Sequence, residues 1–117
     1  MWTLQNAAIL FALAAVGGIT MLVIRLRGTP FPPTWLAIGH GFIALSGLVI
    51  LGNAYLIASL PSLANWALLL FLIAAAGGAT LFFGFHMRSR PLPIPFVLGH
   101  GLLAATGLIL LVLAIYG

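Results

Sequence analysis

Four long apolar stretches, separated by short polar segments, make up nearly the whole chain. Each is close to the length of about 20 residues that an α-helix needs to cross the hydrocarbon core of a bilayer. They extend over about Leu4–Ile24, Trp35–Leu56, Leu63–Phe85 and Ile94–Tyr116. The pattern predicts an all-α integral membrane protein whose single domain, residues 1–117, is an up-down four-helix bundle.

Composition supports a lipid environment and excludes several classes of function. Hydrophobic residues make up 64% of the 117 residues, charged residues 3%, and Asp and Glu are absent, which does not suit a water-exposed surface. The first stretch has no basic region before it, so we expect it to remain as a membrane span rather than to be cleaved as a signal peptide. The lack of cysteine excludes disulfides, thiolate ligands and c-type haem attachment.

The chain is an internal duplication. Residues 1–60 align without a gap with residues 61–117, so that Phe11–Thr20 matches Phe71–Thr80 and Gly39–Leu48 matches Gly99–Leu108. Because the repeated unit is two helices, the first and third spans run in the same direction. We therefore expect two tandem two-helix repeats related by a pseudo-two-fold axis along the membrane normal.

Two histidines occupy matched positions in these repeats, His40 in the second span and His100 in the fourth. Ionisable residues inside membrane spans mark functional sites by default, so the pair is the first candidate for ligand binding. Small residues surround the pair at helical spacing and predict space at its level: Ala44, Gly47, Ala104 and Gly107 on the same helices, and Gly17, Gly18, Gly77 and Gly78 on the first and third spans. Two simpler interpretations compete. The small residues could serve helix packing alone, and each imidazole could be bonded to a carbonyl or to a hydroxyl such as Ser46 or Thr106.

The number of ligands points to a tetrapyrrole. A structural zinc site needs four protein ligands, and the chain has no Cys, Asp or Glu to complete one. A porphyrin supplies four equatorial nitrogens and asks the protein for two axial ligands. The count therefore favours one haem with His40 and His100 as its metal ligands. A chlorophyll-type pigment, whose magnesium takes one axial ligand, stays open as an alternative.

These residues resemble the haem-carrying four-helix bundle of the membrane cytochrome b family. In that family, histidines on the second and fourth helices ligate haem b, and glycines on the first and third let the macrocycle approach the backbone. His40 and His100 match the ligands, and Gly17, Gly18, Gly77 and Gly78 match the glycines. Two-haem members carry a second histidine on each ligand helix, which this chain lacks, so the resemblance implies one haem b per chain.

Four arginines predict the orientation of the bundle. They lie in the first and third connections, as Arg25, Arg27, Arg88 and Arg90. By the positive-inside tendency these loops face the cytoplasm and both termini face the other side, which we expect to hold in a bacterial inner membrane. Without carboxylates in the chain, no arginine has an internal ionic partner. We expect all four to face water, lipid phosphate, a partner subunit or the haem propionates. His86, whose counterpart is Leu26, is expected to be an interfacial polar residue.

The combined expectation is an electron-transfer protein, either a b-type cytochrome or a small subunit of a larger respiratory-type complex. A redox partner protein or a lipid-soluble quinone would exchange electrons with it. The chain has no nucleophile beside a base, and its basic residues form no face for nucleic acid, so neither an enzyme by itself nor nucleic-acid binding is supported. The main alternative is a cofactor-free membrane anchor or assembly subunit.

Overall fold

Each predicted stretch forms one long helix in the computed structural model, which describes residues 2–117. Met1, which we counted in the predicted domain and in the first repeat, lies outside the described residues. The helices are α1 (Trp2–Leu26), α2 (Thr34–Ile57), α3 (Ser62–Leu81) and α4 (Ile94–Tyr116). A single π-helical turn, Phe82–His86, continues α3 and was not predicted. All four helices are long and apolar enough to cross a membrane.

Prolines and one glycine define the helix ends. Pro33, Pro61 and Pro93 directly precede α2, α3 and α4, where the fixed φ of proline suits helix entry and its missing N–H is not needed. After α1 the chain turns at Gly28, whose φ of 104° lies in the left-handed region that favours glycine. Proline therefore defines where α2, α3 and α4 begin, and glycine defines where the chain leaves α1.

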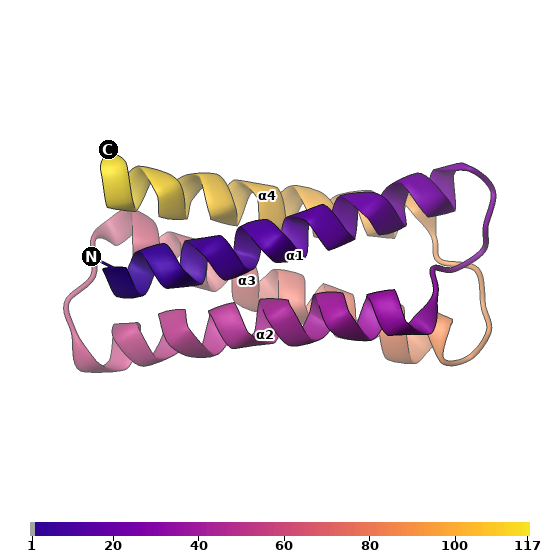
Figure 1. Cartoon of the computed structure of the whole chain (residues 1–117), viewed down its shortest axis with the longest axis horizontal. Coiled ribbons are helices and arrows are strands. Elements are labelled where there is room, and N and C mark those ends of the chain that lie inside the picture. The colour runs from indigo at the N-terminus through magenta and orange to yellow at the C-terminus, as the bar shows by residue number, and fades with distance from the viewer. Residues whose placement is uncertain (1) are drawn as a thin grey trace.

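The helices alternate in direction and form a bundle in chain order (Figure 1). α1 packs most extensively against α2 and α3 against α4, while smaller contacts of α1 with α4 and of α2 with α3 close the bundle. α2 and α4 are thus diagonal neighbours. Both termini and the α2–α3 connection lie at one end, and the α1–α2 and α3–α4 loops, which carry or flank the arginines, lie at the other. The predicted up-down arrangement is confirmed.

The close-packed core occupies only the half of the bundle next to the termini. At its inner limit Phe11 and Phe71 stack with ring centroids 3.7 Å apart and planes 6° from parallel. Glycines on the facing helices make this stack possible, because a Cβ on Gly47 would lie 3.2 Å from Phe11 Cζ and one on Gly107 would lie 3.1 Å from Phe71 Cε1. The remaining buried members of the core are Leu4, Ala7, Leu51, Ala64, Ala67, Leu68 and Leu111.

The half of the bundle next to the arginine loops has no comparable apolar cluster among residues 2–117. Its buried residues are scattered along the elements: Ala14, Pro32, Ala74, Leu81, His86 and Leu92. Protein interiors are normally packed to the density of organic crystals, so a half with few fully buried side chains is where a bound group can be accommodated. The bundle is therefore uneven along its axis.

We expect the two ends of the bundle to be exposed on opposite sides of a membrane. Single cysteines introduced at Thr3 and at Thr29 should react with a membrane-impermeant thiol reagent from opposite sides of intact cells. Labelling of both positions from one side would contradict the predicted topology.

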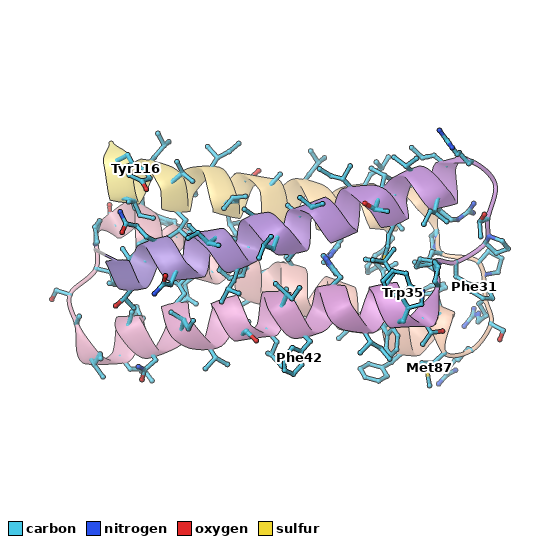
Figure 2. All side chains as sticks on the ribbon, in the orientation of Figure 1. Phe31, Trp35, Phe42, Met87 and Tyr116 are labelled. Atoms are coloured by element: carbon cyan, nitrogen blue, oxygen red, sulfur yellow. The ribbon has the colours of Figure 1, made fainter. Side chains whose placement is uncertain are left out.

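We also expect the phenylalanine stack to stabilise the cofactor-free bundle. Phe71→Ala should lower the free energy of unfolding in detergent by about 3 kcal/mol, because the lost ring leaves a cavity against Phe11 and Gly107. Phe42 provides a matched control, since it is exposed and points away from the bundle (Figure 2). Phe42→Ala should change the same free energy by less than about 0.5 kcal/mol. Equal effects of the two substitutions would show that the stack contributes nothing specific.

Candidate functional site

His40 on α2 and His100 on α4 face each other inside the bundle. Their ring centroids are 6.2 Å apart and their ring planes are inclined by 76°. They come from diagonal helices, so the line between them crosses the bundle interior. The structure thus brings together the two residues that the sequence predicts as a ligand pair.

Each imidazole is oriented by a backbone carbonyl of the neighbouring helix. His40 Nδ1 lies 2.7 Å from the carbonyl oxygen of Ala14, and His100 Nδ1 lies 2.8 Å from that of Ala74. A carbonyl oxygen only accepts, so Nδ1 carries the proton and donates it in both bonds. The lone pair is then on Nε2, which is the arrangement typical of a metal-bound histidine with its second nitrogen held by the protein.

Both Nε2 atoms are available to a ligand. Neither forms a hydrogen bond with the described residues, which have only the Nδ1 contacts to each ring. Neither is among the fully buried polar atoms that lack a partner. The pair therefore offers two nitrogen atoms without hydrogen-bond partners that are not sealed off by the surrounding side chains.

The separation of the rings is compatible with both imidazoles holding one metal, if their Nε2 atoms were its ligands. A metal–imidazole nitrogen bond is about 2 Å long and the nitrogen lies about 1.2 Å from its own ring centroid, so the two centroids would be about 6.4 Å apart. The observed 6.2 Å agrees with that value. No group of three or more His, Cys, Asp or Glu side chains able to hold a metal occurs among residues 2–117. A metal at the pair would therefore need its other ligands from a cofactor.

The paired glycines of α1 and α3 make room for the imidazole rings. A Cβ on Gly18 would lie 3.2 Å from His40 Cε1, and one on Gly78 would lie 3.1 Å from His100 Cε1. A Cβ on Gly17 would lie 3.6 Å from His40 Cβ, and one on Gly77 would lie 3.7 Å from His100 Nδ1. The small residues at this level thus set the position of the ligands, and their contact with a macrocycle stays a prediction.

The small residues on the histidine helices have a different surrounding. Gly47 and Gly107 are buried against the Phe11 and Phe71 rings. They lie about two helical turns from His40 and His100, toward the termini. Ala44 and Ala104 are half-buried between the histidines and that stack. The aromatic stack therefore forms the boundary of the histidine site on the terminal side, a role that the sequence analysis did not assign to Phe11 and Phe71.

Ser46 and Thr106 do not contact the histidines. Their hydroxyls donate to the carbonyl oxygens of Phe42 and Leu102 on their own helices, at 2.9 and 2.8 Å. The alternative that a neighbouring hydroxyl satisfies the imidazole is therefore wrong. The alternative of a carbonyl partner is correct for Nδ1, and it leaves Nε2 free for ligation.

Two of the arginines have partners within the chain. Arg25 Nε donates to the carbonyl oxygen of Leu92 at 2.9 Å, which ties the end of α1 to the α3–α4 loop. The Arg90 guanidinium lies over the Phe85 ring, 5.2 Å from its centroid, in a cation–π contact. Arg27 and Arg88 are exposed. A carbonyl and an aromatic ring thus give Arg25 and Arg90 partners within the chain, and the expectation that the four arginines face water, lipid phosphate, a partner subunit or an anionic ligand stays a prediction.

His86 lies at the arginine end as expected, but it is buried in the bundle rather than exposed at the interface. Its Nε2 is 3.0 Å from Thr34 Oγ1, and its ring contacts Phe31 and Phe82 with centroids 5.3 and 5.2 Å away. Its Nδ1 is buried without a hydrogen-bond partner. Sequence reasoning missed this burial, because the matched residue in the first repeat is Leu26 and the π-helical turn was not predicted.

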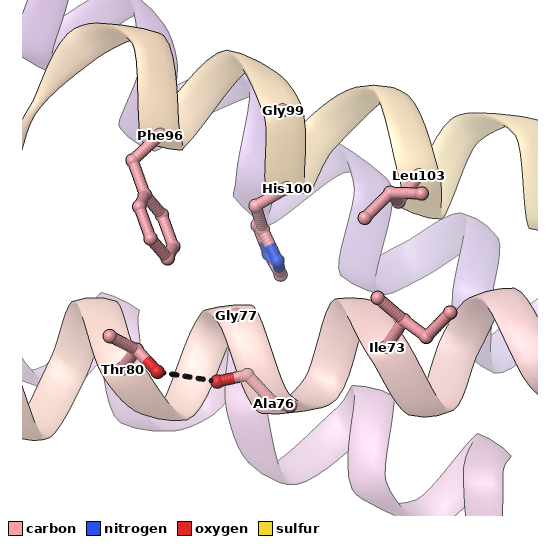
Figure 3. A pocket seen from close by; sticks show the side chains of 8 residues that line it. All are labelled: Ile73, Ala76, Gly77, Thr80, Phe96, Gly99, His100 and Leu103. Carbon is pink, nitrogen blue, oxygen red and sulfur yellow. Dashed lines mark hydrogen bonds between the residues drawn. The ribbon is translucent and has the colours of Figure 1, made fainter.

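A groove between α3 and α4 reaches the His100 ring from the outer face of the bundle (Figure 3). Its volume is about 420 Å³, and His100 and Phe96 project into it from α4 toward Gly77 on α3. Ala76 also lines it, where the first repeat has the larger Val16. The two histidines therefore differ in their surroundings although their hydrogen bonds are alike.

No protein-family model, no curated protein and no solved structure matches the chain. Its function is therefore inferred from its own residues. The most specific of these are the two imidazoles. Each carries its proton on Nδ1, donates it to a backbone carbonyl of the neighbouring helix and lies against a glycine.

We expect the Gly18 contact to hold the His40 ring in its hydrogen bond. Gly18→Leu should displace the ring, because even a Cβ at this position is 3.2 Å from Cε1. Nitrogen NMR of the cofactor-free protein should show that His40 changes from the Nδ1–H tautomer to a mixture. Gly41→Leu is the matched control, since a Cβ there meets nothing within 4 Å. An unchanged His40 signal in Gly18→Leu would contradict this role of the glycine.

Proposed function

We propose that the chain is an integral membrane protein that binds one haem b through His40 and His100 and transfers electrons. The observation that carries this proposal is the pair of imidazoles with centroids 6.2 Å apart and both Nδ1 atoms bonded to carbonyls. Two neutral nitrogen donors facing each other across a bundle suit a metal that brings four ligands of its own. No Cys, Asp or Glu in the chain offers a different donor set.

Membrane insertion is supported by the outer surface of the bundle. Large apolar side chains are exposed on all four helices, among them Val16, Ile19, Phe42, Val49, Leu72, Leu102 and Ile109. Such a continuous apolar exterior is unfavourable in water and ordinary in lipid. The arginines at one end then support orientation of both loops toward the cytoplasm of a bacterial inner membrane.

The surroundings of the pair fit a flat cofactor that extends toward the arginine loops. On the terminal side of the histidines, the Phe11–Phe71 stack and the core behind it are closely packed. On the arginine side the described residues form no such core. We infer that a macrocycle held at the histidines would have the edge that carries its carboxylates in this less densely packed half, toward the basic end.

In this function each residue has a specific task. Bound haem supplies a one-electron iron couple whose potential depends on its axial ligands and their hydrogen bonds. The carbonyls of Ala14 and Ala74 keep the Nδ1 protons in place, so each Nε2 remains a neutral donor. Gly18 and Gly78 let the rings approach α1 and α3. The apolar surroundings exclude water, which raises the influence of every nearby charge.

The duplicated sequence supports the symmetric nature of this site. Each repeat contributes one imidazole, one carbonyl, one glycine pair and one ring of the phenylalanine stack, all 60 positions apart. Two copies of one unit thus build a single site on the axis between them. Electron exchange would then involve a redox partner protein, a larger respiratory-type complex or a lipid-soluble quinone.

Removal of either histidine should abolish stoichiometric haem binding, because one axial ligand and one oriented donor are lost together. The measurement is the reduced and oxidised visible spectrum of purified His40→Ala and His100→Ala, with haem quantified per chain. His86→Ala, saturated with haem, should keep the band positions of the wild type. A requirement for His86 with a dispensable His100 would refute the symmetric pair.

The wild-type protein itself decides between the alternatives. A colourless preparation from haem-replete cells would favour a cofactor-free anchor or assembly subunit. Absorption bands of a magnesium tetrapyrrole would favour a chlorophyll-type pigment. A stoichiometric metal without any tetrapyrrole would also contradict the haem proposal.

A further inference from the structure

His86 is the one buried polar or charged side chain among the described residues, and half of its hydrogen-bonding capacity is unused. Nε2 contacts the Thr34 hydroxyl at 3.0 Å, while Nδ1 has no partner. Leaving a buried nitrogen unpaired destabilises the fold, because the nitrogen loses its hydrogen bonds to water and gains none in return. Folded proteins leave few such groups, and those that remain often mark a ligand, ion or water.

The π-helical turn is what places His86 inside the bundle. Leu26, the matched residue at the end of α1, is 56% exposed, whereas His86 is 7% exposed. His86 is the last residue of the π-helical turn Phe82–His86, and the first half of the chain has no such turn at Leu26. Turns of this kind inside α-helices are rare and occur frequently at functional sites. Burial of His86 is therefore a feature of the second repeat only.

A negatively charged partner for His86 cannot come from a side chain of residues 1–117. The sequence contains no Asp or Glu, and the C-terminus lies at the other end of the bundle (Figure 1). When the Thr34 hydroxyl donates to Nε2, Nδ1 carries the proton and seeks an acceptor oxygen. An acidic oxygen at this position must belong to a bound molecule.

The position of His86 along the bundle suits a carboxylate attached to a macrocycle. Gly78 is beside the His100 ring, and His86 follows eight residues later, which is at most roughly 12 Å of helix rise. It lies on the arginine side of the pair, in the half without a close-packed core. If a porphyrin were held by His100 with a propionate toward the loops, that propionate would lie on the same side of the pair as His86.

We propose that His86, held by Thr34, donates a hydrogen bond from Nδ1 to a free carboxylate of the tetrapyrrole. The inference rests on the proposed haem function and adds a specificity to it. His86 selects a macrocycle with ionised propionates and disfavours one whose carboxylates are esterified. Since the first repeat has Leu26 at this position, the site is symmetric at the metal and asymmetric at the edge of the ring.

The test compares haem b with its dimethyl ester, which keeps the metal and the ring but cannot present an ionised carboxylate. Affinities for the cofactor-free wild type and His86→Leu are measured by absorbance titration in a neutral detergent. The wild type should prefer haem by about tenfold or more, as expected for a hydrogen bond to a charged group. His86→Leu, which copies the first repeat, should reduce this preference to within about twofold and keep the band positions.

Thr34→Val is the second variant, because it leaves His86 in place and removes only the hydroxyl that orients it. It should lower the preference for haem over the ester by a smaller factor than His86→Leu does. This variant also keeps the test decisive if His86→Leu fails to fold. An unchanged preference in Thr34→Val would then overturn the assignment.

The remaining outcomes are distinguishable. Equal wild-type affinity for haem and its ester, or an unchanged preference in His86→Leu, would overturn the role of His86 while the haem proposal stands. Absence of tetrapyrrole binding by the wild type would overturn both. If the effect of His86→Leu appears only in vesicles with anionic lipid, His86 contacts a lipid phosphate instead and the inference is wrong.

Discussion

The hydrogen bond from each imidazole Nδ1 to a carbonyl of the adjacent helix is the interaction on which the candidate site depends. It joins α2 to α1 and α4 to α3, so it contributes to the packing of each helix pair as well as to the orientation of the ring. A hydrogen bond in an apolar interior is costly to break, because no water is available to replace the carbonyl as the partner of the N–H group. The same bond assigns the lone pair to Nε2 and directs the chemistry of the pair.

The packing of the bundle is divided along its axis. Near the termini, the Phe11–Phe71 stack and the fully buried Leu4, Leu51 and Leu111 form a conventional core. In lipid, helix association depends on close van der Waals packing rather than on a hydrophobic driving force, so this half holds the helices together. The arginine half has only scattered buried residues, so it contributes less close packing to the bundle.

The two matched halves of the chain are equivalent at the histidines and different at the arginine end. Hydrogen bonds, glycine contacts and the phenylalanine stack recur at matched positions, and their distances agree closely between the halves. At the arginine end, only the second repeat has a π-helical turn and a buried His86. The two matched halves thus provide two imidazoles in the same hydrogen-bonding arrangement, and only the second half provides a buried polar group at the arginine end.

The sequence by itself determined the number, length and alternation of the helices, because runs of apolar residues punctuated by proline leave few other arrangements. Matched positions also identified His40 and His100, since a duplicated ionisable residue in an apolar span is conspicuous. The tertiary structure alone decided which atoms pair: that Ala14 and Ala74 accept from the rings, and that Gly47 and Gly107 receive phenylalanine rings rather than facing the histidines. Backbone carbonyls and helix rotation leave no trace in residue identity. For the same reason the π-helical turn, and with it the burial of His86, became visible only in the folded chain.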